Sequence, residues 1–205
     1  EGGAIAFNLP EPFNNDEIYK RLCINTLHGQ TKDALAKTKK GEWRYDVVEA
    51  GYKCNMTDIQ ASIGLVELER YDSDTLVRRK STFDKYTTAF SKHQWAQLPL
   101  YETSDKSSSY HVYPLRIKGI TEQQRDLIIK EIFDREIAVN VHVIPLPMLS
   151  YYKSLGYNIA DYPVTFDNYS REISMPVFYN LTDEQIDSVI KAVIESVEIV
   201  RASNS

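Results

Sequence analysis

Apolar residues recur every three or four positions in three stretches of the chain, and each stretch follows a Thr–Gln pair spaced three residues apart. In such a pair the threonine hydroxyl accepts a hydrogen bond from the glutamine backbone N–H, and the glutamine side chain returns to the threonine N–H. The pairs are Thr57 and Gln60, Thr121 and Gln124, and Thr182 and Gln185. The sequence therefore predicts three amphipathic helices that begin at these points.

The first of these helices has a glycine in its interior. Its apolar positions are Met56, Ile59, Ile63 and Val66. Because a mid-helix glycine costs about 1 kcal/mol relative to alanine, we expect Gly64 to lie where another helix packs closely. The helical pattern continues through "RRKSTFDKYTTAFSKH", and we expect a bend near Asp72-Ser73-Asp74.

Shorter patterns predict the remaining elements. Expected strands are 4–7, 23–27, 110–117, 137–142 and the "REISMPVFY" stretch that Pro176 limits. Expected short helices are 16–22 and 148–155, the second of which ends at Gly156. The "LPLYETSDKSSS" stretch has the composition of a linker. The β-α-β…β-α order of the second half predicts an α/β fold, a small sheet with helices on one face.

The start of the chain raises a separate expectation. Residues 4–7 are apolar and have the pattern of a buried strand, which needs neighbours on both sides, and the chain opens "EGGAIAFN" without an initiator Met. We therefore expect the sequence to be a C-terminal piece of a longer protein. The alternative is an edge strand at a processed N-terminus.

Composition excludes several classes of protein. With 24 basic and 29 acidic residues the net charge is −5, so the chain has no electrostatic footprint for nucleic acid. No apolar run has the roughly 20 residues of a membrane helix, and no signal peptide is visible. Cys23 and Cys54 form no disulfide framework, and neither has metal-ligand spacing to another Cys or His. We expect a cytoplasmic protein without a metal site.

Six motifs in order carry a family resemblance. They are "EGGAIAFN", "HG" at 28–29, "GYKCNMTDIQASIGLVELER", "SSYHVYPLRI", "VNVHVIPLPMLSYYKSLGY" and "REISMPVFYNLTDEQIDSVI". From Glu1 to about Val197 the chain resembles the C-terminal half of the sugar-nucleotide aminotransferases, which use pyridoxal phosphate and have the aspartate-aminotransferase type of fold. The resemblance implies the tail of a large cofactor domain with a dimer-crossing loop (1–56), a long connecting helical segment (57–98) and a small C-terminal α/β domain (99–205).

The resemblance also implies cofactor-binding residues. The family's Schiff-base lysine is expected upstream of Glu1, so no catalytic residue is assigned within this chain. The family loop that matches 51–55 crosses the dimer interface and contacts the cofactor phosphate of the neighbouring subunit. The usual Asn-aromatic-Arg is here Lys53, Cys54 and Asn55, so Lys53 and Asn55 are the expected phosphate contacts. Turn chemistry offers the alternative of a solvated Lys53 and an Asx-type turn at Asn55.

The resemblance also implies substrate contacts. His142, in the segment that faces the active site in the family, is expected to touch the sugar nucleotide, although Val143 and Pro147 depart from the family pattern. His28 and Tyr52 are further expected substrate contacts. Trp43 and Tyr45 are expected to shape a nucleotide pocket with Tyr52, or to bury the long loop against a partner chain.

Histidines also have simpler interpretations. His142 fits a strand-end histidine hydrogen-bonded to backbone as well as it fits a substrate contact. His111 lies within the strand pattern, where a partly buried structural histidine is expected rather than a ligand.

The implied activity belongs to the full protein. It would transfer an amino group from an amino acid, expected to be glutamate, to a keto-sugar nucleotide in cell-surface polysaccharide or glycan biosynthesis, as a homodimer. The present chain alone is expected to be inactive. Two alternatives stay open: a pyridoxal-phosphate sugar dehydratase, in which a histidine replaces the lysine, and a non-catalytic dimerisation module.

Overall fold

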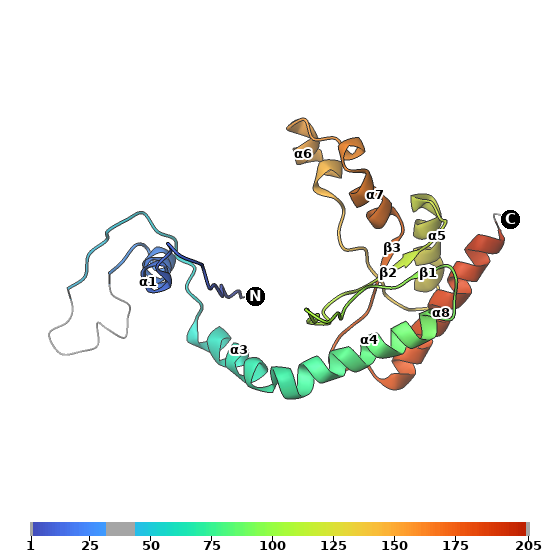
Figure 1. The fold of residues 1–205 in the computed structure, drawn as a ribbon, viewed down its shortest axis with the longest axis horizontal. Coiled ribbons are helices and arrows are strands. Elements are labelled where there is room, and N and C mark those ends of the chain that lie inside the picture. The colour runs from blue at the N-terminus through green and yellow to red at the C-terminus, as the bar shows by residue number, and fades with distance from the viewer. Residues whose placement is uncertain (1, 32–43, 204–205) are drawn as a thin grey trace. The chain divides into compact units, whose positions relative to one another are not determined.

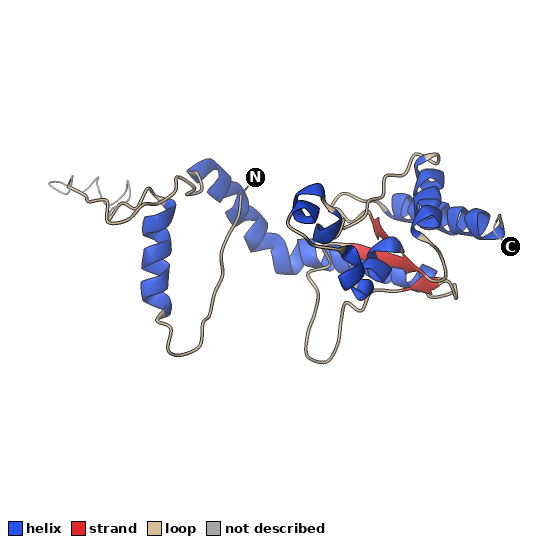
Figure 2. Cartoon of the chain, turned by 90° about the horizontal axis from the view of Figure 1, so that it is seen from above, coloured by secondary structure: helices blue, strands red, loops and turns tan. Residues whose placement is uncertain are grey.

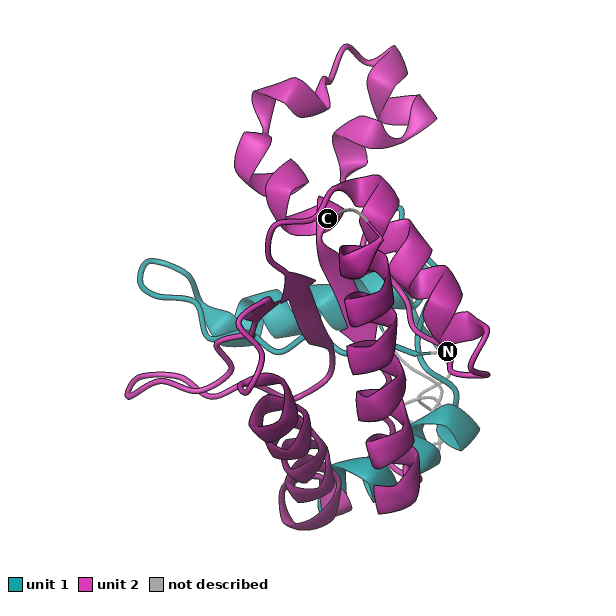
Figure 3. Cartoon of the chain, turned by 90° about the vertical axis from the view of Figure 1, so that its right-hand side faces the viewer, with its two compact units in different colours: residues 1–69 teal, residues 70–205 magenta. Residues whose placement is uncertain are grey.

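The computed structural model describes residues 2–31 and 44–203, so Trp43 lies outside the described residues. The chain divides into two compact units, residues 1–69 and 70–205, shown in separate colours in Figure 3. The division falls at the end of a helix inside the predicted connecting segment 57–98. Each unit is described below by itself.

Among the residues that the structure describes, the first unit contains helices α1 and α3 (Figure 1). Helix α1, Asn15–Thr26, begins at Asn14, whose side chain accepts hydrogen bonds from the backbone N–H groups of Asp16 and Glu17. Helix α3, Asp58–Arg70, begins at the predicted capping box, because Thr57 N–H donates to Gln60 Oε1 and Gln60 N–H donates to Thr57 Oγ1. Neither helix contains a buried residue.

Three expectations for the first unit are wrong. Residues 4–7 are irregular and mostly exposed, because no described segment lies beside them to form a ladder. Segment 23–27 is not a strand, because α1 propagates from its Asn14 cap as far as Thr26. Gly64 marks no close helix contact within the described residues, since none of their atoms outside the backbone of α3 itself lies within 4 Å of the position that a Cβ would take there.

The second unit is built around a three-stranded antiparallel sheet with the order β1-β2-β3 (Figure 2). The strands are β1, Ala96–Gln97, β2, Tyr113–Ile117, and β3, Glu172–Met175. The register pairs Tyr113 with Met175 and Arg116 with Glu172. Every residue of β3 is buried, and β2 alternates between buried and half-buried positions.

Helices accompany this sheet throughout the second unit. After a π-helical turn, Tyr71–Thr75 (η1), come α4, Leu76–Phe90, and, beyond β2, α5, Glu122–Phe133. Short 3-10 turns, η2 (Leu146–Met148) and η3 (Ile159–Asp161), alternate with α6, Ser150–Ser154, and α7, Pro163–Ser170. The chain closes with α8, Asp183–Ala202, which packs against both α4 and α5 (Figure 1). The π turn contains the stretch where a bend was expected, and α7 was not predicted.

The core of the second unit joins the helices to the sheet. Phe83 of α4 makes edge-to-face contacts with Tyr101, Tyr110 and Tyr113 at centroid distances of 5.5, 5.3 and 5.0 Å. The predicted stripe of α8 is buried at Ile186, Val189, Val193 and Val197. The capping boxes at Thr121 and Thr182 are both present as predicted.

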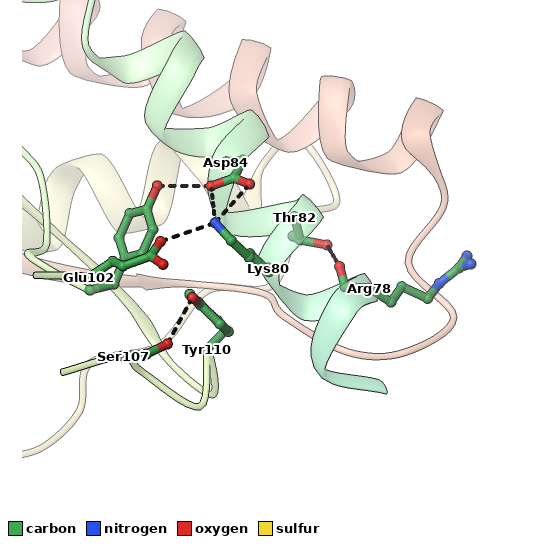
Figure 4. A network of polar contacts seen from close by, with 8 residues as sticks. Arg78, Lys80, Thr82, Asp84, Glu102, Ser107 and Tyr110 are labelled. Carbon is green, nitrogen blue, oxygen red and sulfur yellow. Dashed lines mark hydrogen bonds and ion pairs between the residues drawn. The ribbon is translucent and has the colours of Figure 1, made fainter. Parts of the chain in front are cut away.

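A polar network fastens the predicted linker to α4 (Figure 4). Lys80 Nζ donates to Asp84 and, at 3.2 Å, to Glu102, while the Tyr101 hydroxyl donates to Asp84 at 3.0 Å. Glu102 also pairs with Ser107 across a single β-bridge. The irregular chain between β1 and β2 is therefore held to the helix by side chains.

The expected strand at 137–142 is wrong, and the structure gives the reason. Only Asn140 pairs with β3, exchanging backbone hydrogen bonds of 3.2 and 2.7 Å with Ser174. Two residues later the His142 backbone N–H donates to the Glu172 side chain at 3.1 Å. Because the carboxylate accepts this hydrogen bond in place of a backbone carbonyl, the pairing does not extend into a strand.

Candidate functional site

The loop 51–55 is attached to the C-terminal end of α1 by backbone hydrogen bonds. Tyr52 N–H donates to Asn25 O at 2.7 Å, Cys54 N–H donates to Thr26 O at 3.0 Å, and His28 N–H donates to Tyr52 O at 2.9 Å. Leu27 and Lys53 form an isolated antiparallel bridge. The last turn of α1 thus positions the loop that carries Lys53.

Two glycines allow these segments to cross. A Cβ on Gly51 would lie 2.3 Å from Gly29 N and 2.7 Å from Asn25 O. A Cβ on Gly29 would lie 1.8 Å from Glu49 O, and Gly29 has a φ of +74°. Only glycine permits both approaches, so the crossing of 28–30 over 49–51 is set by these two residues.

The crossing places three predicted site residues next to one another in the first unit. His28, with a φ of +59°, contacts Tyr52 through the backbone, and Tyr52 precedes Lys53. The side chains of all three are exposed, and that of Tyr52 is 75% exposed. Tyr45, 53% exposed, lies in the same unit. Contact of these residues with substrate stays a prediction.

Lys53 and Asn55 also come together. Lys53 Nζ donates a hydrogen bond to Asn55 Oδ1. The ammonium retains two N–H donors and the amide retains its NH₂ group, so the pair offers several donors and one positive charge at one place. A phosphate needs such a donor set, and the residues therefore fit the phosphate of the expected cofactor. That contact itself stays a prediction.

His142 belongs to a hydrogen-bonded group in the second unit. Its Nδ1 lies 2.9 Å from Ser174 Oγ, and its backbone N–H donates to Glu172 Oε2 at 3.1 Å. Ser174 Oγ in turn donates to Glu172 Oε1. Ser174 and Glu172 are 3% and 5% exposed, so His142 connects the surface to a buried polar pair.

Burial raises the pKa of the Glu172 carboxyl above its ordinary value of 4.5, while the hydrogen bonds from Ser174 and the His142 backbone act in the opposite direction. Arg125, 2% exposed, lies behind β3 and donates to the backbone carbonyls of Tyr169 at 2.8 Å and Glu172 at 3.3 Å. The guanidinium thus anchors the backbone that carries Glu172.

His142 and Ser174 line a surface pocket of about 380 Å³. His111 and Asn140 line the same pocket. His111 is exposed and precedes β2, so the expectation of a partly buried strand histidine is wrong. The structure brings two histidines to one pocket, which sequence spacing alone does not reveal.

Sequence reasoning missed Glu172, Ser174 and Arg125. The available signal was the spacing of Glu172 and Ser174, which puts two polar side chains on the same face of an otherwise apolar strand. For Arg125 the sequence carries no comparable signal, because a charged residue in the first turn of a helix is ordinarily solvated.

Within 2–31 and 44–203, no group of three or more His, Cys, Asp or Glu residues could hold a metal ion. Over the same residues, no helix has both the length and the apolar character that crossing a membrane requires.

Comparison with known proteins identifies the family of the chain. Residues 1–194 match the model of the DegT/DnrJ/EryC1/StrS aminotransferase family. A spore coat polysaccharide biosynthesis protein of Bacillus subtilis is 32% identical, over 90% of this chain and 48% of that protein. A UDP-4-amino-4,6-dideoxy-N-acetyl-beta-L-altrosamine transaminase of Helicobacter pylori is 25% identical, over 97% and 48%. The chain spans about half the length of the curated relatives it matches.

Solved structures also show similarity to about half of a sugar aminotransferase. A protein from Streptococcus pneumoniae described as a candidate sugar aminotransferase, in its PMP form, superposes with a TM-score of 0.86 at 42% identity, over 95% of this chain and 48% of that one. The same protein was solved in a PLP form, and pyridoxal phosphate is the cofactor of this group. The predicted fold class and the predicted match to one half of the fold are confirmed. The chain belongs to the DegT/DnrJ/EryC1/StrS aminotransferase family.

Proposed function

We propose that the chain is the C-terminal part of a pyridoxal-phosphate enzyme that moves an amino group from glutamate to a keto-sugar nucleotide in cell-surface polysaccharide or glycan biosynthesis. The family match supports the aminotransferase class. The Bacillus subtilis and Helicobacter pylori relatives support a sugar acceptor and a role in polysaccharide or glycan assembly. The observation that carries the proposal for this chain is the Lys53–Asn55 pair on a loop fixed by the glycine crossing.

In this proposal Lys53 and Asn55 bind the cofactor phosphate. Lys53 supplies charge and Asn55 supplies amide N–H donors, and the crossing at Gly29 and Gly51 fixes both. When bound, pyridoxal phosphate stores the amino group and withdraws electrons from the reacting carbon. The lysine that moves the proton is expected upstream of Glu1, so this chain supplies binding and orientation.

The proposed assembly is a homodimer in the cytoplasm, in which loop 51–55 serves the neighbouring subunit. The apolar side chains of α3 support an extensive contact surface, because five of them are 58–77% exposed. They are Ile59, Ile63, Leu65, Val66 and Leu68. A helix with this composition needs cover that the described residues of the first unit do not supply.

Substrate contacts are proposed for each unit by itself. In the first unit His28 and Tyr52 present exposed side chains beside Lys53. In the second unit His142 lines a pocket with polar neighbours, which suits hydroxyl groups of a sugar.

Cofactor affinity tests the proposal in the full-length protein. Lys53→Ala removes a charge-assisted contact, so the Kd for pyridoxal phosphate is expected to rise roughly 10- to 100-fold, and Asn55→Ala is expected to raise it about three- to tenfold. Lys20→Ala on α1 is the matched control, because Lys20 is an exposed lysine of the same unit and is expected to leave the Kd unchanged. Absorbance titration measures all three, and wild-type affinity in both site variants would remove the phosphate assignment.

Product analysis separates the remaining alternatives. With a keto-sugar nucleotide and glutamate, the full-length protein is expected to give an amino sugar and 2-oxoglutarate. A deoxygenated sugar would identify a dehydratase, and a dimer that binds no cofactor would identify a dimerisation module. The 205-residue chain alone is expected to show no transaminase activity, and turnover by it would contradict the assignment of the reactive lysine upstream of Glu1.

A further inference from the structure

The hydrogen bonds around His142 have a fixed direction. A serine hydroxyl has one proton to donate, and Ser174 Oγ donates it to Glu172 Oε1. At a pH well above its pKa the Glu172 carboxylate has no proton and accepts from both Ser174 and the His142 backbone. Ser174 Oγ can therefore meet His142 Nδ1, 2.9 Å away, only as an acceptor. The neutral imidazole must then hold its proton on Nδ1.

The second ring nitrogen is available for another role. In the described part of the chain, no group forms a hydrogen bond with His142 Nε2. The His142 side chain is exposed and lines the pocket that it shares with His111 and Asn140. An unprotonated Nε2 on such a ring accepts a hydrogen bond from a hydroxyl or N–H group.

We propose that Glu172 and Ser174 are positioning residues that hold His142 in its Nδ1–H form, so that Nε2 accepts a hydrogen bond from a hydroxyl group of the sugar. The part concerning the sugar rests on the proposed function, and the tautomer does not. Neither Glu172 nor Ser174 needs to touch substrate. They act through the orientation and proton of His142.

The surroundings make this arrangement rigid. Glu172 and Ser174 lie on β3, whose register with β2 is fixed by four residue pairs. Arg125 holds the Glu172 backbone through its carbonyl, and Asn140 exchanges two backbone hydrogen bonds with Ser174. A packed strand holds the side chains of Glu172 and Ser174 more rigidly than a loop can. This suits their proposed role, because His142 Nε2 must present its lone pair in one direction.

Nitrogen NMR of the 205-residue chain tests the tautomer directly. The chain has four histidines, and His142→Gln identifies the signal of His142. In the wild type at about pH 8, Nδ1 is expected to be protonated and Nε2 unprotonated. A wild-type His142 with its proton on Nε2 overturns the proposal.

Glu172→Gln is the sharpest variant because it keeps every heavy-atom contact. The carbonyl oxygen of the new amide is needed by the His142 backbone N–H, so the NH₂ group of that amide must face Ser174 and donate to Oγ. The Ser174 hydroxyl then donates to Nδ1, and the proton of His142 is expected to move to Nε2. Retention of the wild-type tautomer in this variant contradicts the proposed chain of hydrogen bonds.

Two serine variants provide a second, independent reading. Ser174→Ala removes the acceptor of Nδ1–H, and the His142 proton is expected to move to Nε2, whereas Ser174→Thr keeps the hydroxyl and is expected to keep the tautomer. Ser170→Ala is the matched control: Ser170 is also buried, but its hydroxyl donates to Asp167 O instead. A tautomer change in Ser170→Ala, or none in Ser174→Ala, overturns the proposal.

Kinetics of the full-length protein test the sugar contact. Glu172→Gln is expected to raise the KM for the keto-sugar nucleotide about three- to tenfold and to leave the half-reaction with the amino acid unchanged. A changed tautomer with an unchanged KM refutes the sugar contact alone. If no sugar nucleotide is aminated by the wild type, the proposed function fails while the tautomer result stands.

Discussion

The two units of this chain bury their side chains to very different extents. In the second unit, Phe83, Tyr86, Tyr113 and Ile128 are at most 1% exposed and belong to one continuous core. In the described part of the first unit, neither α1 nor α3 has a buried residue. What orders the first unit is the backbone crossing at Gly29 and Gly51. The comparison teaches that one region is stabilised by its own apolar interior, and the other by main-chain geometry.

This difference extends to the candidate site residues of each unit. Lys53 and Asn55 are carried by a crossing of two loop segments, whereas His142 is hydrogen-bonded to β3, whose residues are all buried. Changes to side-chain volume should therefore act mainly on the second unit. Substitutions of glycine should act mainly on the first unit.

The largest effect is expected from Phe83→Ala. Phe83 is 1% exposed and packs edge-to-face on three tyrosines, so its removal leaves a cavity in the second unit. We expect a loss of about 3–5 kcal/mol in the free energy of unfolding. Urea denaturation of the 205-residue chain, followed by tyrosine fluorescence, measures it.

Phe13→Ala is the matched substitution in the first unit. Phe13 is 55% exposed, and its loss is expected to change the free energy of unfolding by about 0.5 kcal/mol or less. Equal losses for the two phenylalanines would mean that the first unit has an apolar interior after all.

Gly51→Ala should have the next largest effect, and it should be local. The new Cβ would lie 2.3 Å from Gly29 N and 2.8 Å from His28 C, so the crossing must open. We expect a cost of more than about 1 kcal/mol, seen as faster amide exchange at Tyr52 and Cys54. Unchanged exchange at these two amides would show that the crossing does not order the loop.

Gly64→Ala sharpens the comparison because it is expected to stabilise the first unit, whereas Gly51→Ala is expected to destabilise it. A Cβ at Gly64 meets nothing within 4 Å, so alanine should stabilise α3 by about 0.5–1 kcal/mol. Amide exchange within α3 of the 205-residue chain reports the gain. Slower exchange in Gly64→Ala is the expected result. Faster exchange would support the close helix contact at Gly64 that the sequence predicts.

The smallest effect concerns pH and the Glu172 carboxyl. Because burial raises its pKa in the folded state, the folded chain binds more protons than the unfolded chain at pH values just above 4.5. Its contribution to stability is therefore present below that value and is lost as pH rises through the raised pKa. In Glu172→Gln this contribution is absent at every pH, so the variant should gain stability relative to the wild type as pH rises from about 4 to about 7.

Urea midpoints at several pH values measure this difference. Ser170→Ala serves as the control, since it leaves every carboxyl in place and should follow the wild-type profile. A variant curve that runs parallel to the wild type across this range would show that the pKa of Glu172 is the same in both states.

Much of the helical structure was predictable because its signals are local. The three capping boxes and the apolar stripe of α8 depend on residues three or four positions apart, and each is present in the structure. The expected strands at 4–7 and 137–142 failed for the opposite reason. A strand depends on a partner elsewhere in the chain, and these segments have at most an isolated bridge among the described residues.

The candidate site residues also divide into those that local motifs predict and those that only the fold brings together. The resemblance pointed to Lys53, Asn55 and His142 by their place in motifs, and the structure shows that the first two touch each other. The motifs did not point to Glu172 as the partner of His142, because thirty residues separate the two and only the fold brings them together. A contact of this kind is set by sheet register rather than by local sequence.

The carboxylate that accepts the His142 backbone N–H has one more effect, on the edge of the sheet. β3 is an outer strand, and an outer strand with free main-chain groups invites pairing with a strand of another molecule. Here Asn140 takes one pair of those groups, and Glu172 then turns the neighbouring segment away from further pairing. At the opposite edge β1 is only two residues long. The sheet thus offers little template to a second chain, and this protects the folded protein against aggregation through its strands.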